Sequence, residues 1–276
     1  MKKKPTKMSF QPAAGARDLN PQQVEKNQLL SKRLATVYKL WGYEEVSPPR
    51  VEGIATLMAG GAISSNDIVR LVADEPLGLR PEMTASIARA ACTRLAEKPR
   101  PLRLWAAGTV FENKESSETG LCIEENLKSG VELFGVKGIA AEMELLSLLL
   151  EALETFNLKA SNRPSLLFGH TGLIDLILDD CEDDIKEDLR KSLLEFDRLK
   201  LEGINIQTDK KDILIKVQSM RGNPHNIIDQ LELIYGKKEI LIDLKRLFTV
   251  IDPFSKKYGL TLQLDPTFLP HFNLYT

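Results

Sequence analysis

The hydrophobic pattern of the chain changes near Pro164, and this change limits the fold more than any other feature of the sequence. Before it, short β-rich runs such as 102–111 alternate with turn residues and with single helical stretches. After it, residues 173–258 follow a mostly helical pattern that glycines interrupt. A strand-rich first part followed by a mainly helical stretch and a last strand predicts an α+β fold.

Punctuating residues predict where the principal elements begin and end. Asn20 and Pro21 are typical of a helix start, and Gly42 is typical of a helix end. The remaining pattern predicts strands at 68–72, 102–111, 126–134, 166–170 and 260–264, a polar hairpin loop at 113–120, and helices over 83–95 and 139–156.

Charge and cysteine usage exclude several functional classes. The chain has 37 Lys and Arg against 39 Asp and Glu, a net charge of −2, which does not predict a large nucleic-acid-binding face. Its three cysteines form no CxxC pair and predict buried thiols in a reducing compartment, with no zinc site. The three histidines share no ligand spacing, so we expect structural roles for them, no metal and no cofactor. Without a signal-like or membrane-spanning apolar segment, a cytoplasmic, soluble protein is expected.

Five short motifs occur in a fixed order along the first half of the chain. They are Pro12-x-x-Gly15-x-x-Asp18-x-x-Pro21, Gly42-Tyr43-x-Glu45-Val46-x-x-Pro49-x-x-Glu52, Leu79-Arg80-Pro81-Glu82-x-Thr84, Gly108-x-Val110-Phe111 and Gly130-Val131-Glu132-x-Phe134-Gly135. In this order they resemble the class II aminoacyl-tRNA synthetase core, in its histidyl-tRNA synthetase branch. The resemblance implies an antiparallel sheet flanked by helices, with a helical insertion.

The resemblance also implies a division of the chain into four parts. Residues 1–10 form a flexible lead-in, 11–170 the synthetase-like core, 171–258 the mainly helical insertion and 259–276 the return strand. The chain stops at Tyr275-Thr276, inside a motif that normally continues, so a truncated gene or a fragment is expected.

Departures from the synthetase pattern change the functional expectation. Glu112 stands where the family carries an arginine that grips the α-phosphate of ATP, and Lys114 is the only cation of the loop that follows. The synthetase Arg-Glu-Phe-His-Gln run appears as Glu-Glu-Asn-Leu-Lys at 124–128. The chain therefore resembles the regulatory subunits of ATP phosphoribosyltransferase, which have no catalytic residues. The alternatives are a divergent or fragmentary histidyl-tRNA synthetase core and a stand-alone amino-acid-binding paralogue.

The resemblance assigns an amino-acid pocket, the expected site for histidine as a feedback effector. Its residues are Glu82, Thr84, Glu132 and Tyr275. Each has a structural alternative: Glu82 and Thr84 also suit a helix N-terminus, Glu132 could point outward, and Tyr275 could belong to the core. The resemblance further implies a short-form catalytic subunit as partner, a homodimer formed through residues 24–52 within a hetero-oligomer, and no tRNA.

Overall fold

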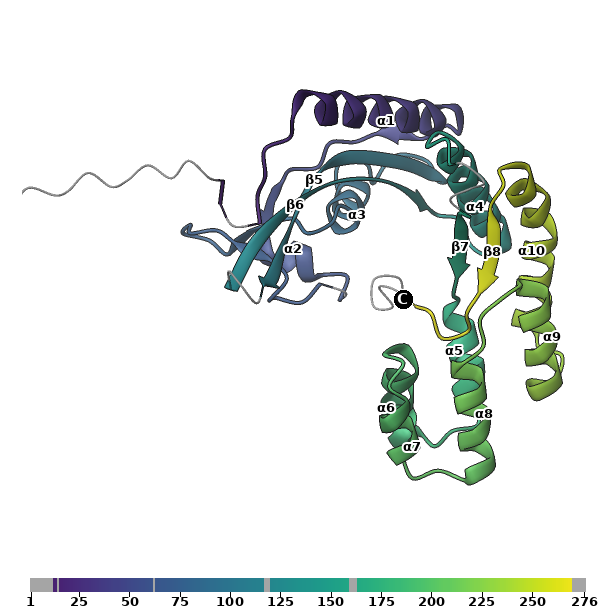
Figure 1. Ribbon diagram of the computed structural model, residues 1–276. Coiled ribbons are helices and arrows are strands. Elements are labelled where there is room, and N and C mark those ends of the chain that lie inside the picture. The colour runs from purple at the N-terminus through teal and green to yellow at the C-terminus, as the bar shows by residue number, and fades with distance from the viewer. Residues whose placement is uncertain (1–11, 14, 62, 117–119, 159–162, 270–276) are drawn as a thin grey trace, which may run out of the picture. The chain divides into compact units, whose positions relative to one another are not determined.

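The contacts of the chain divide it into two compact units in the computed structural model (Figure 1). The first unit contains the described residues up to 136, and the second contains those from 137 onward. The predicted core, insertion and return strand divide the chain by its resemblance to the family, whereas the two units divide it by packing. The predicted boundaries therefore differ from those of the units and stay a prediction. The structure describes residues 12–13, 15–61, 63–116, 120–158 and 163–269.

Over the residues that the structure describes, the first unit combines three helices with two three-stranded sheets. Its elements are α1 (Pro21–Leu40), β1 (Glu44–Glu45), β2 (Val51–Gly53), α2 (Ile54–Met58), β3 (Val69–Arg70), β4 (Leu77–Leu79), α3 (Thr84–Cys92), β5 (Leu102–Ser116) and β6 (Gly120–Phe134). One sheet has the order β1-β5-β6 and the other β2-β4-β3.

The long hairpin of β5 and β6 is the frame of the first unit. The two strands pair antiparallel from Leu102 opposite Phe134 to Ser116 opposite Gly120. The predicted loop over 113–120 is therefore wrong for residues 113–116, which belong to β5, and for Gly120, which begins β6. The polar residues of that segment suggested a loop, but Lys114 pairs with Glu124 across the strands, which supports the ladder there.

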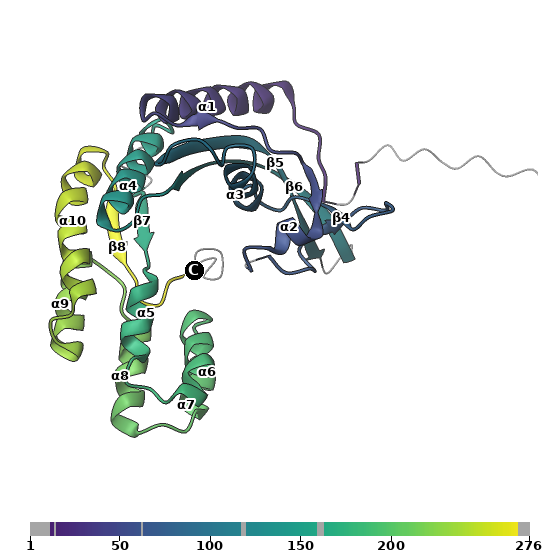
Figure 2. The same ribbon diagram turned by 180° about the vertical axis from the view of Figure 1, so that it is seen from behind.

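Helices cover the two faces of this hairpin (Figures 1 and 2). On one face, Leu104, Ala106 and Val110 pack against Ile87 and Ala91 of α3. On the other face, the Tyr38 ring of α1 lies 5.5 Å from the Trp105 ring. Residues directly opposite one another in the ladder share a face, so the register decides which polar side chains lie beside α3.

Local chemistry accounts for the ends of α1 as the sequence predicts. The Asn20 side chain accepts from the Gln23 backbone N–H, and the Gln23 side chain accepts from the Asn20 N–H. The helix ends at Leu40, and Gly42 adopts a φ of +78°, a backbone conformation that glycine tolerates at no cost. The predicted burial of the cysteines is wrong for Cys92, the exposed last residue of α3, while Cys122 and Cys181 are partly buried.

The second unit is a helical array on one pair of parallel strands. Its elements are α4 (Ile139–Glu154), β7 (Ser165–Phe168), α5 (Thr171–Leu178), α6 (Asp183–Leu194), α7 (Arg198–Gly203), α8 (Thr208–Gln218), α9 (Pro224–Tyr235), α10 (Glu239–Lys257) and β8 (Thr261–Leu264). Leucine and isoleucine side chains from these helices and from β8 form one core. The predicted helical stretch and the strand near 260–264 are confirmed, and β8 pairs with β7.

The backbone just after β7 lies very close to the backbone of Phe268. A side chain at Gly169 would place its Cβ 1.4 Å from the Phe268 carbonyl oxygen, so the position requires glycine. The next residue, His170, accepts from the Gly172 N–H through Nδ1 at 3.0 Å and caps α5. The structural role expected for this histidine is confirmed.

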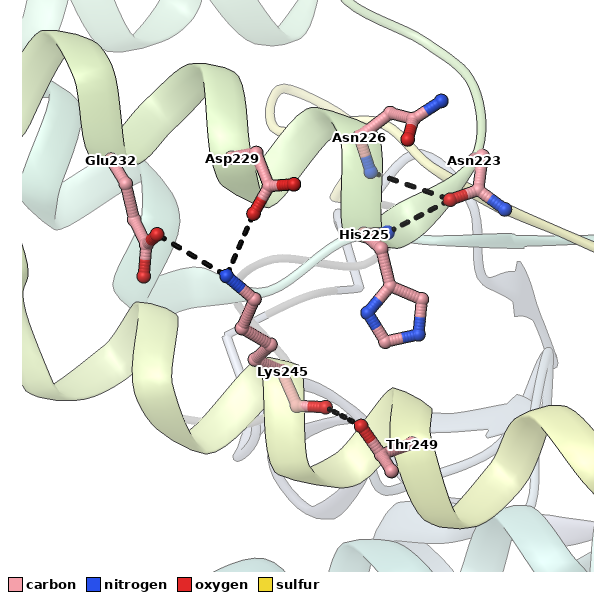
Figure 3. A network of polar contacts seen from close by, with 7 residues as sticks. All are labelled: Asn223, His225, Asn226, Asp229, Glu232, Lys245 and Thr249. Carbon is pink, nitrogen blue, oxygen red and sulfur yellow. Dashed lines mark hydrogen bonds and ion pairs between the residues drawn. The ribbon is translucent and has the colours of Figure 1, made fainter.

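The helix pair α9–α10 is joined at its surface by a polar network (Figure 3). The Lys245 ammonium of α10 lies 2.7 Å from Asp229 and 3.2 Å from Glu232 of α9. Asn223 caps α9 by accepting from the backbone N–H groups of His225 and Asn226. Among the described helices, none is both long enough and apolar enough to cross a membrane.

Candidate functional site

The Glu82 carboxylate lies at the start of α3 and binds its first backbone donors. It accepts from the N–H of Thr84 and, at 2.9 Å, from the N–H of Ala85. The helix-N-terminus interpretation of Glu82 is thus confirmed. An ionised carboxylate has about four acceptor positions, so two remain for a ligand.

Glu132 of β6 faces the same helix. It lies opposite Leu104, whose side chain is fully buried beneath α3, and the neighbouring Thr84 side chain acts to lower the pKa of the Glu132 carboxyl. The outward orientation considered for Glu132 is therefore not observed. The structure brings together three of the predicted pocket residues, Glu82, Thr84 and Glu132; Tyr275 lies outside the described residues.

Two carboxylates at one place favour a cation. Burial raises the pKa of Glu132 above its ordinary value, and the nearby Glu82 charge raises it further. A carboxyl whose pKa is raised by folding makes the folded state lose stability as the pH rises through that pKa. A bound ammonium group would offset this cost, so the arrangement suits a cationic ligand.

A buried arginine that was not predicted as a site residue joins the segment before α3 to β5 and to the Pro48–Pro49 segment. The Arg80 side chain is 3% exposed and donates to the backbone carbonyls of Pro48 at 2.8 Å and Thr109 at 3.1 Å. A Cβ at Gly108 would lie 2.4 Å from its Nη2 atom. The Leu79–Thr84 and Gly108–Phe111 motifs are therefore in contact through Arg80. The glycine at position 108 was the feature of the sequence that could have indicated this contact.

Charged side chains continue this face of the hairpin beyond Glu132. Lys128 lies 2.6 Å from Glu112, and Lys114 forms an ion pair with Glu124. Each cation of the stripe formed by Glu112, Lys114, Glu124 and Lys128 thus has a carboxylate partner. The stripe has no net charge, whereas the synthetase pattern implies arginine at position 112.

A cleft of about 750 Å³ lies in the first unit beside α3. It is lined by residues 46–49, by Glu52 and by Arg89, Ala90, Arg94 and Leu95. Glu52, 8% exposed, binds Arg89 at 2.8 Å at its base. The extended segment of the second motif therefore borders open space on this side.

No group of three or more His, Cys, Asp or Glu side chains in the described ranges is arranged to hold a metal ion. The acidic run at 179–184 instead leads into α6, whose first turn contains Asp183 and Asp184. Of the remaining histidines, His225 lies in the first turn of α9, and His271 lies outside the described residues.

Comparisons with known proteins agree with this geometry. The histidyl-tRNA synthetase family model matches residues 15–276. An ATP phosphoribosyltransferase regulatory subunit from Prochlorococcus marinus (strain MIT 9303) is 61% identical over 269 residues, which are 98% of this chain and 69% of that protein.

Solved structures share the fold. A structure titled as an ATP phosphoribosyltransferase regulatory subunit/histidyl-tRNA synthetase from Bacillus halodurans C matches with a TM-score of 0.83 at 25% identity, covering 98% of this chain and 72% of that chain. A chain of the ATP phosphoribosyl transferase (HisG:HisZ) complex from Thermotoga maritima matches with a TM-score of 0.64 at 13% identity, covering 89% of this chain and 82% of that chain. The predicted class II synthetase-like fold is confirmed.

Proposed function

The chain belongs to the family of ATP phosphoribosyltransferase regulatory subunits, and from this membership we propose that it assembles with the short-form catalytic subunit of that enzyme. In this complex it supports the first step of L-histidine biosynthesis and its feedback inhibition by histidine. The observation that carries the proposal is Glu112, which stands in place of a phosphate-binding arginine and is paired with Lys128.

The charge at position 112 decides between a regulatory subunit and a synthetase. Two unit charges about 4 Å apart interact by about 1–4 kcal/mol at effective dielectric constants of 80 to 20. Replacing attraction to the α-phosphate by repulsion changes the interaction by roughly twice this amount. Because about 1.4 kcal/mol is a tenfold change in rate, loss of this arginine removes up to several orders of magnitude from adenylation.

We therefore expect the purified chain to show no histidine-dependent ATP–pyrophosphate exchange. Glu112→Arg alone is expected not to restore it, because the new arginine leaves Lys128 without its carboxylate partner and the loop at 113–123 still lacks an arginine. The measurement is radiolabelled pyrophosphate exchange beside an authentic histidyl-tRNA synthetase. Exchange above background in the unaltered chain would support the synthetase alternative.

Assembly is tested directly by mixing the chain with a short-form catalytic subunit. We expect co-elution and a gain of ATP phosphoribosyltransferase activity that neither protein has alone. Added histidine is expected to reduce the activity of the mixture. A catalytic subunit that neither co-elutes nor changes its activity would contradict the proposed partnership.

The effector pocket of this proposal consists of Glu82, Thr84, Glu132 and Tyr275. The two carboxylates and the Thr84 hydroxyl at the start of α3 support it, because they match the charge and hydrogen bonding of an α-ammonium group. Histidine is expected to bind with its ammonium between Glu82 and Glu132.

A homodimer formed through residues 24–52 is the second part of the assembly proposal. Only Val37 and Tyr38 of α1 are buried, whereas Leu29 is 47% exposed and Leu40 is 75% exposed. Tyr43, which lies within the same predicted segment, is 2% exposed and belongs to the core of the unit. The exposed leucines and the cleft beside residues 46–52 support a second copy as the partner of this surface.

Sedimentation is expected to show a dimer at micromolar concentration. Leu40→Glu is expected to weaken association roughly tenfold or more, because it places a charge within the proposed apolar contact. Leu233→Glu is the matched control, since Leu233 is 87% exposed on α9 of the second unit. A folded monomer of the unaltered chain, or equal effects of the two substitutions, would contradict this interface.

A further inference from the structure

A cavity of about 250 Å³ lies within the second unit at the carboxyl ends of its two parallel strands. Phe168, the last residue of β7, and Leu264, the last residue of β8, both line it. Ligands of parallel sheets commonly bind at this end of the strands. Glu82, Thr84 and Glu132 are not among the residues that line it.

The walls of the cavity are almost entirely apolar. Leucines of α4 and α10 and the Phe248 ring form them, and Phe248 packs edge-to-face on Phe168 with ring centroids 5.2 Å apart. A small number of polar groups in an otherwise apolar hollow is the usual composition of a small-molecule site. Here the polar groups are Glu142 and His170.

The hydrogen bonds around His170 determine which polar groups are free. Its Nδ1 accepts from the Gly172 N–H, so the ring proton of the neutral imidazole is on Nε2. Nε2 lies 3.7 Å from the Glu142 Oε1 atom, longer than a hydrogen bond. The one donor of the neutral ring is therefore on the nitrogen that lies nearest to the Glu142 carboxylate.

Glu142 keeps unused acceptor capacity. Contact with the His170 ring is the main cause that lowers its pKa, so the carboxylate is ionised at neutral pH. Its side chain is 44% exposed, and His170 is its nearest ionisable neighbour. Over the described ranges, no lysine or arginine pairs with this carboxylate, so a negative acceptor stands beside an apolar hollow.

We propose that this cavity binds a small primary amine that carries a single ring or a short alkyl chain. The apolar body fills the hollow between α4 and α10, and the ammonium group binds Glu142. At about 30 Å³ per water molecule, the volume corresponds to about eight waters, and therefore to a ligand of similar atom count. A carboxylate head would meet the Glu142 charge, which also disfavours free histidine here.

The probe is 2-phenylethylamine, titrated into the 276-residue chain by calorimetry. The control compounds are 3-phenylpropionate and 2-phenylethanol, which have the same phenylethyl group and a different polar head. We expect the amine to bind, the alcohol to bind roughly tenfold more weakly, and the acid not to bind. Glu142→Gln is expected to weaken the amine roughly tenfold and to leave the alcohol unchanged, because only the charge-assisted bond is lost. Equal affinities of amine and acid would overturn the proposal.

Filling the cavity provides an independent test. Leu145→Phe adds volume at a lining position, whereas Leu149→Phe adds the same volume one turn further along α4, at a residue that is 40% exposed and does not line the cavity. We expect the first variant to abolish amine binding and the second to retain it. Circular dichroism melting shows that both are folded. Unchanged binding by folded Leu145→Phe would place the amine elsewhere and overturn the proposal.

Discussion

Glu82→Gln is expected to weaken histidine binding roughly ten- to hundredfold. A hydrogen bond to a charged group contributes about 1.5–3 kcal/mol, and about 1.4 kcal/mol corresponds to a factor of ten. The substitution removes the charge that faces the ammonium group but keeps the side-chain length. Thr84→Val is expected to act in the same direction with a smaller effect, since a neutral hydroxyl forms a weaker bond. Calorimetric titration of histidine into each variant measures both effects.

The structural role of Glu82 requires a stability control for this experiment. Its carboxylate accepts from two backbone donors of α3, and glutamine retains one acceptor oxygen for them. The free energy of unfolding is therefore expected to fall by only about 0.3–1 kcal/mol. Glu125→Gln is the matched control, because Glu125 is exposed and its ladder partner Phe111 lies on the opposite face from Glu132. Equal histidine affinities of wild type and folded Glu82→Gln would place the effector site elsewhere.

Local chemistry made the ends of helices predictable from the sequence. Asn20 and Pro21 start α1, and Gly42 follows its end, because a capping side chain and a left-handed residue act within a few positions of one another. Local rules also explain why the polar segment after Phe111 was wrongly predicted as a loop. Lys114 of this segment forms an ion pair with Glu124, ten residues further along the chain, and a rule based on neighbouring residues does not anticipate this contact.

The pocket residues were predicted by resemblance, but their arrangement depends on contacts between distant segments. Glu132 faces α3 because the hairpin register places it opposite Leu104, and a shift by one residue would reverse its direction. Arg80 lies beneath Gly108, 28 positions further along the chain, and residue types alone do not reveal such a contact. Both contacts needed the structure, although each involves a residue of a recognisable motif.

Arg221→Met is expected to lower the free energy of unfolding by about 3 kcal/mol, the lower end of the cost of leaving a buried charge without its partner. The Asp265 side chain is 1% exposed, and both Nε and Nη2 of Arg221 bind its Oδ2 atom, at 3.0 and 2.7 Å. Thr267 donates to the other oxygen from its backbone N–H and its hydroxyl, which keeps the loss from being larger. Urea unfolding provides the measurement.

We attribute this loss of stability to the burial of Asp265, and not to the ion pair as such. An exposed Arg–Asp pair serves as the control that distinguishes these two causes. Arg246 lies 3.3 Å from Asp243 on α10, with side chains 71% and 45% exposed, so Arg246→Met is expected to cost less than about 1 kcal/mol. Adding Asp265→Asn to Arg221→Met is expected to recover part of the stability, because the amide removes the unpaired charge and still accepts from Thr267. Equal losses for the two arginine substitutions would show that the buried carboxylate does not depend on Arg221.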